Sequence, residues 1–179
     1  MPIIAMSIRL QAIRMFLERA LLVHDEYTQR FLSGPNSDSL EDDAEYENAG
    51  DVLLDYQDIV VRAALGELNA LVEHELKHLA IQVQGRSRFD SASYRQMDRG
   101  KASGIVESQF SIKLSELPGS ADIEAIRHTV NAYKHNEGLR RDQRFSVERY
   151  VLDWDEALRY VDSVRAFLRA LPGVRDQWG

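Results

Sequence analysis

Hydrophobic and polar positions alternate along most of the chain with the period of amphipathic helices. In residues 3–32 an apolar face runs from Ile13 to Phe31, and the sequence Ser33-Gly34-Pro35-Asn36 follows it. Glycine suits the residue after a helix C-terminus, and proline cannot continue a helix. The pattern therefore predicts a first long helix over residues 3–32.

A second long helix is predicted over residues 51–84, where apolar side chains form two stripes. One stripe runs from Leu53 to Ile81, and the other runs from Val61 to Leu79. A helix with two apolar stripes is buried on more than one side, which is typical of the centre of a bundle.

Two further helices are predicted in the C-terminal half. One covers residues 121–136, after a break at Leu117-Pro118-Gly119-Ser120 in which Ser120 is the expected N-cap. The last covers 153–171, because Asp153 and Glu156 form a capping-box pattern. The predicted fold class is all-α, an up-and-down helical bundle of four to five helices, with residues 1–179 forming a single domain.

Two segments interrupt this helical pattern. Residues 36–50 are predicted to be an acidic connector, and residues 85–118 a basic irregular insertion. Within the insertion, residues 102–117 are ambiguous between a strand and a short helix. Apolar residues alternate there from Phe110 to Leu114, as in a strand, but the run is too short to decide.

The net charge of -7, from 29 acidic and 22 basic residues, argues at first against a nucleic-acid partner. Nine of the acidic residues, however, lie within 38–58, where no base occurs; without them 20 acids remain beside the 22 bases. Basic residues concentrate in 86–101 and 127–149. If these two stretches meet in the fold, we expect a locally basic face that suits RNA.

The chain contains no cysteine. Disulfides, cysteine zinc sites and thiol catalysis are therefore excluded, and a reducing, cytoplasmic location is expected. Charges at Arg9 and Arg14 interrupt the first apolar run, so neither a signal peptide nor a membrane span is expected there. Nothing in the sequence indicates a cofactor.

The most informative segment for function is 127–138. Arg127, Asn131 and His135 are spaced by four residues, so they follow one side of the predicted helix, away from the core stripe between Ile126 and Tyr133. A histidine can transfer protons at neutral pH, and an arginine can stabilise charge on a phosphoryl oxygen. The asparagine can orient either group. RNA supplies its own 2′-OH as nucleophile, so no metal is needed.

This segment resembles the HEPN superfamily of helical domains, through its order of arginine, polar residue and histidine and through the string from Asn131 to Gly138. The helical layout over 50–171 is also similar. The resemblance implies a metal-independent endoribonuclease, of a kind found among toxins and phage-defence effectors, that acts as a homodimer. Arg127, Asn131 and His135 would be its catalytic residues. The expected substrate-binding residues are His128, Lys134, Arg140 and Arg141. The expected partners are a second copy, RNA, and a protein partner such as an antitoxin.

Two other functions remain open. Seven residues separate Arg127 from His135, more than the family motif usually has, which favours a non-catalytic bundle that binds a protein partner or a nucleotide. The string from His74 to His78 (HELKH) also matches the HExxH zinc motif. Ile81 and Gln84 stand where a metzincin would continue with glycine and histidine. We therefore expect His74 and His78 to form hydrogen bonds inside the bundle.

Overall fold

The computed structural model describes residues 3–32, 42–87, 91–136 and 153–172. In these residues the secondary structure is helical throughout, without a strand, which confirms the predicted all-α bundle. The elements are α1 (Ile3–Leu32), α2 (Asp42–Val83), α3 (Ser91–Gln96), α4 (Arg99–Phe110), the 3-10 turn η1 (Leu114–Glu116), α5 (Ser120–Asn136) and α6 (Trp154–Ala170).

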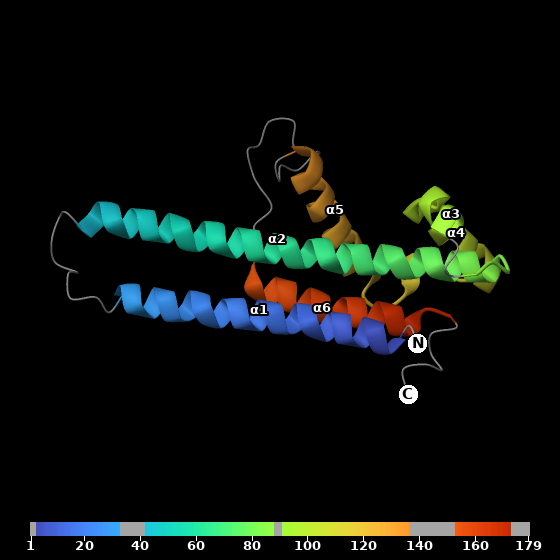
Figure 1. Ribbon diagram of the computed structural model, residues 1–179, viewed down its shortest axis with the longest axis horizontal. Coiled ribbons are helices and arrows are strands. Elements are labelled where there is room, and N and C mark those ends of the chain that lie inside the picture. Colours follow the sequence, from blue (N-terminus) through green and yellow to red (C-terminus); the bar gives the residue numbers. More distant parts are fainter. Residues whose placement is uncertain (1–2, 33–41, 88–90, 137–152, 173–179) are drawn as a thin grey trace.

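The long helices α1 and α2 lie antiparallel, and α6 runs beside them (Figure 1). With 42 residues, α2 extends for about 63 Å and contacts every other α-helix. Both of its predicted apolar stripes are buried, because α1 and α6 cover one side while α4 and α5 pack against another. The centre of the core consists of long aliphatic side chains that are completely enclosed, among them Leu10, Leu17, Leu65, Leu68, Leu76, Ile126 and Leu168.

The acidic connector predicted over 36–50 is only partly correct. Helix α2 begins at Asp42, so residues 42–50 are helical, and the rest of the segment lies outside the described residues. Acidic side chains near a helix N-terminus interact favourably with the helix dipole. The acidic residues from Asp42 onward therefore belong to the first turns of α2.

The irregular insertion predicted over 85–118 is also wrong for most of its length. It contains α3 and α4, and the alternation from Phe110 to Leu114 is not a strand. Ala102 and Val106 are buried one turn apart on α4, so the short-helix alternative for residues 102–117 is correct as far as Phe110. Asp98 caps α4, since its side chain accepts a hydrogen bond from the Lys101 backbone N–H at 2.8 Å.

The two predicted caps differ in outcome. Asp153 is the N-cap of α6, and its Oδ1 accepts hydrogen bonds from the backbone N–H groups of Asp155 at 2.8 Å and Glu156 at 3.1 Å. Ser120 is not a cap, because it is the first residue of α5 and its hydroxyl donates to the Ser115 carbonyl at 2.7 Å. That bond ties α5 to the turn before it.

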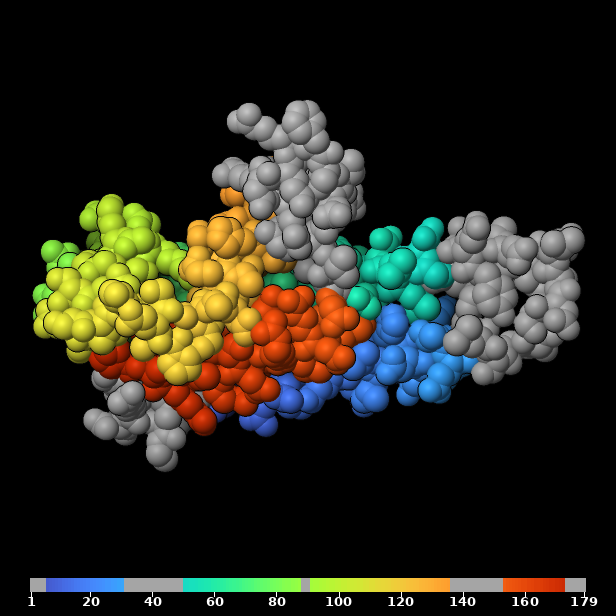
Figure 2. Space-filling model, turned by 180° about the vertical axis from the view of Figure 1, so that it is seen from behind, coloured from blue at the N-terminus to red at the C-terminus, as the bar shows by residue number. Residues whose placement is uncertain are grey.

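The side of the bundle opposite to Figure 1 carries α5 at its surface. Figure 2 shows α5 (orange) bordered by the 111–119 segment (yellow) and by α6 (red). Both neighbours contact α5, and α2 lies beneath it. One side of α5 therefore packs on the bundle while another faces solvent.

Candidate functional site

Helix α5 carries all the predicted catalytic and substrate-binding residues that the structure describes. Ile126 and Val130 are buried in the core, whereas Arg127 and Asn131 are half-buried and His135 is exposed. At 100° per residue, these three polar residues lie within about 80° of one another around the helix axis. The sequence prediction that they share a side of the helix not needed by the core is confirmed.

Arg127 and His135 are not close together within one copy. Eight residues of helix separate them by about 12 Å along the axis, with Asn131 halfway between them. The nearest histidine to Arg127 is His128, whose Nε2 lies 3.4 Å from Arg127 Nη2. One α5 helix thus offers the three side chains as a row and not as a single cluster.

The other predicted contacts are less defined. His128 and Lys134 are exposed, and they lie about 100° and about 20° from Arg127 around the axis of α5. Arg140 and Arg141 lie outside the described residues. The charged or titratable residues among the predicted site residues that the structure describes on α5 are therefore Arg127, His128, Lys134 and His135.

The structure adds two residues that sequence reasoning missed. The Glu124 carboxylate accepts hydrogen bonds from Arg127 Nε at 2.8 Å and, through its other oxygen, from Arg99 Nη2 at 3.0 Å. Arg99 comes from α4, and its Nη1 donates to Asn69 of α2 at 3.0 Å. The spacing of Glu124 and Arg127 was a visible signal, since residues three apart are neighbours on a helix. No sequence signal connected Arg99 to them.

Burial and a neighbouring cation both act on Arg99. Removal from solvent lowers the pKa of its guanidinium, and the positive charge of Arg127 lowers it further, while Glu124 and Glu73 counteract this by raising it. An arginine remains charged despite such effects. Arg99 and Arg127 are therefore two permanent cations held near each other by one carboxylate.

A cleft of about 340 Å³ opens beside this ion-pair cluster. Arg99 and Glu124 form part of its wall, and its volume lies at the lower end of the range for small-molecule sites. The apolar side chains that line it are Leu76, Leu114, Ile123 and Phe167.

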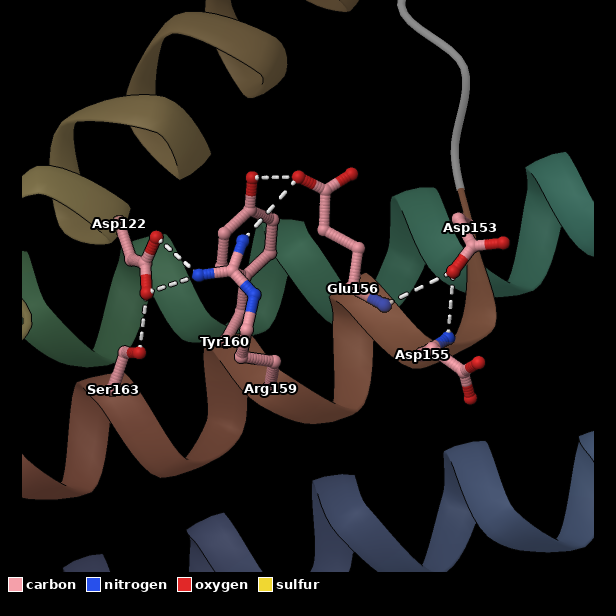
Figure 3. A network of polar contacts seen from close by, with 7 residues as sticks. All are labelled: Asp122, Asp153, Asp155, Glu156, Arg159, Tyr160 and Ser163. Atoms are coloured by element: carbon pink, nitrogen blue, oxygen red, sulfur yellow. Dashed lines mark hydrogen bonds and ion pairs between the residues drawn. The ribbon is translucent and has the colours of Figure 1, made fainter.

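The N-terminal half of α5 is held against α6 by a polar network. Both oxygens of Asp122 accept hydrogen bonds from Arg159 Nη1 at 2.6 Å, and one of them also accepts from the Ser163 hydroxyl (Figure 3). On the other side, the Tyr133 hydroxyl donates to Asp58 of α2 at 2.8 Å. These contacts fix how α5 is placed on the bundle, and hence which of its sides faces outward.

The HExxH residues form an aromatic cluster. The rings of His74 and His78 meet edge to face with centroids 4.2 Å apart, and His74 Nδ1 lies 3.1 Å from the Tyr94 hydroxyl of α3. Among the described residues there is no group of three or more histidines, aspartates and glutamates that could hold a metal. The expected hydrogen bond is observed for His74, and His78 is buried with its ring against those of His74 and Tyr94.

Comparison with known proteins gives no relative: no protein-family model matches the chain, and no curated protein or solved structure resembles it significantly. The similarity to the HEPN superfamily rests on residues 127–138 and on the helical layout alone. None of the described helices combines the length and hydropathy needed to cross a membrane.

Proposed function

We propose that the chain is a metal-independent endoribonuclease that acts as a homodimer and uses the exposed side of α5. The observation that carries this proposal is the row of Arg127, Asn131 and His135 along the side of α5 that the core leaves uncovered. Cation, amide and imidazole are the groups that cleavage of a phosphodiester by its own 2′-OH requires.

A two-fold axis through Asn131 would bring the separated groups together. Arg127 and His135 each lie four residues from Asn131, so two antiparallel α5 helices crossing there place Arg127 of one copy beside His135 of the other. The same axis pairs His128 with Lys134 of the second copy. All these groups are cationic or can become so, and a phosphate between the two helices would offset their repulsion.

The proposed reaction forms a bond between the 2′-oxygen and phosphorus and breaks the bond from phosphorus to the 5′-oxygen. His135 accepts the 2′-OH proton, and the imidazolium that forms donates that proton to the departing 5′-oxygen. Arg127 stabilises the negative charge on the non-bridging oxygens, and Asn131 orients the ribose. The products carry a 2′,3′-cyclic phosphate and a 5′-OH.

One observation favours a second candidate function. In this second candidate the chain is a non-catalytic bundle that binds a protein or a nucleotide. The Arg127 guanidinium is occupied by Glu124, at 2.7 Å between Nη2 and Oε2, and would have to be released before it could bind a phosphate. In this second candidate the α5 surface binds without cleaving.

Cleavage of labelled single-stranded RNA in excess EDTA tests the proposal. We expect wild type to produce cyclic-phosphate ends, and Arg127→Ala and His135→Ala to lose at least about a hundredfold of the rate. Arg165→Ala is a matched control, because Arg165 also pairs with a carboxylate three residues earlier, at 2.8 Å from Asp162, but lies on α6. It should cleave like wild type. Absence of cleavage by wild type on varied RNAs would refute the nuclease and leave the binding module.

A further inference from the structure

Two arginines from different helices share one carboxylate at the edge of the proposed active site. Arg99 of α4 binds Glu124 Oε1 at 3.0 Å, and Arg127 of α5 binds Oε2 at 2.7 and 2.8 Å. Glu124 is 51% exposed, whereas Arg99 is only 18% exposed and is further fixed by Asn69. Arg99 is thus held beneath the surface, whereas Arg127, 36% exposed, and Glu124 lie at the surface. Guanidinium groups bind carboxylate and phosphate oxygens in the same geometry.

The charges around Glu124 do not balance. Two permanent cations face one carboxylate, and the other acid that acts on Arg99, Glu73, is already paired with Lys77 at 2.6 Å. The excess positive charge favours the binding of a further anion, and each RNA phosphodiester carries one negative charge.

A similar arrangement elsewhere in the chain is balanced. Asp162 of α6 also binds two arginines, Arg14 of α1 at 2.9 Å and Arg165 at 2.8 Å. Arg14 binds a second carboxylate, Glu18, at 2.8 Å, so two cations face two anions. Asp162 is 54% exposed, like Glu124, and therefore provides an internal comparison for it.

The space beside the Glu124 cluster fits the remainder of a nucleotide. The 340 Å³ cleft is lined by Arg99 and Glu124, by apolar side chains of four helical elements, and also by Glu107 and three serines. A ribose and a base attached to a phosphate at the arginines would extend into this cleft, where the apolar lining suits the face of a base.

We propose that Arg99 and Arg127 together form a phosphate-binding site for RNA, and that Glu124 occupies this site until RNA displaces it. The nucleoside next to the bound phosphate enters the adjacent cleft. This assignment rests on the proposed function for its choice of RNA as ligand. It adds Arg99, which does not lie on α5, as a substrate-binding residue, and gives Glu124 the role of an internal competitor.

Binding of a short single-stranded RNA with 2′-O-methyl groups tests this proposal apart from catalysis, because the blocked 2′-oxygen cannot attack. We expect Glu124→Gln to bind about fivefold more tightly than wild type at low salt, since its amide no longer competes for the arginines. Asp162→Asn should bind like wild type. A Glu124→Gln affinity no higher than that of Asp162→Asn would overturn the proposal.

A second pair of variants keeps the test decisive if Glu124→Gln folds poorly. Arg99→Gln should weaken binding at least about fivefold and lower the salt slope by about 0.7, the value for loss of one phosphate contact. Arg14→Gln removes the counterpart arginine at Asp162, and it should change neither the affinity nor the salt slope. Equal binding by these two variants would refute the site.

Cleavage of unmodified RNA separates this proposal from the nuclease. A tighter-binding Glu124→Gln without any cleavage by wild type would refute the nuclease and leave the phosphate-binding site. Cleavage by wild type, together with no effect of Glu124→Gln on binding, would support the nuclease and refute the phosphate-binding site.

Discussion

Gly119 lies directly against the backbone of Ser163, so that a Cβ placed on Gly119 would be 2.3 Å from the Ser163 carbonyl oxygen. Gly119 also has a φ of 78°, in the left-handed region that other residues rarely adopt. It is the last residue before α5, and Ser163 is in the middle of α6. This close approach of backbone to backbone sets the position of α5 on the bundle.

Gly119→Ala should therefore destabilise the fold by about 2–4 kcal/mol, from backbone strain and from displacement of α5 against α6. Urea unfolding monitored by circular dichroism measures this. Gly85→Ala is the matched control, because Gly85 has a φ of 73° and nothing within 4 Å of its added Cβ. It should cost only about 1 kcal/mol. Equal losses would show that the Ser163 contact is unimportant.

Tyr160 gives the fold an alkaline limit. Its ring is buried and its hydroxyl donates to Glu156 at 2.7 Å. Burial raises the pKa of Tyr160, and the hydrogen bond to Glu156 raises it further. The folded state therefore retains the proton more strongly than the unfolded state, whose tyrosine pKa is about 10. The stabilising contribution is complete below that pH and is lost as the pH rises above it.

We expect the stability advantage of wild type over Tyr160→Phe to decrease above pH of about 10, by at most about 1.4 kcal/mol per pH unit. Unfolding free energies in urea at several alkaline pH values measure this. Tyr27→Phe serves as the control, because Tyr27 is exposed and loss of its hydroxyl should change stability little. If the difference in unfolding free energy between wild type and Tyr160→Phe stayed constant with pH, the raised pKa of Tyr160 would be contradicted.

His78 is expected to stabilise the core without a metal. It is buried, and its ring centroid lies 5.2 Å from that of Tyr94, so it joins α2 to α3. His78→Ala should cost about 2 kcal/mol through the space it leaves, whereas excess EDTA should leave the melting temperature of wild type unchanged. The exposed His135 provides the control, since His135→Ala should have little effect on stability. A fall in melting temperature with EDTA in wild type but not in His78→Ala would indicate a metal at the HExxH string.

Mixing two inactive variants tests whether the proposed active site is shared between copies. A heterodimer of Arg127→Ala and His135→Ala would keep one site with Arg127 from one chain and His135 from the other. Random exchange of subunits should therefore restore about a quarter of the wild-type rate. If each site used Arg127 and His135 of the same chain, the mixture would remain inactive. The controls are wild type carried through the same exchange procedure and each variant alone.

The pattern of apolar residues was sufficient to predict a helix wherever the helix is long and its apolar face is continuous. The predicted limits of α1, α5 and α6 agree with the structure to within two residues. The same reasoning failed between Asp42 and Gly50 and in α3 and α4. Those segments are short, or are rich in charge, and helical periodicity there is too weak to outweigh the signals for loop or strand.

For the candidate site, the spacing along α5 correctly placed Arg127, Asn131 and His135 on one side of the helix, because helical geometry alone relates residues four apart. It could not find Arg99, which is 28 positions before Arg127 and reaches Glu124 only because α4 and α5 both pack on α2. Nor could it find the cleft, whose lining comes from α2, α4, η1, α5 and α6.

The sequence by itself thus determined that this protein is a helical bundle, where its main helices run, and which side of α5 is polar, since these follow from backbone geometry and the burial of apolar side chains. Only the tertiary structure decided which charges meet. Arg99 reaches Glu124, and Arg159 and Ser163 reach Asp122, because helix packing brings together residues that are distant along the chain. Contacts of that kind have no period in the sequence, and they define the surface on which the proposed function depends.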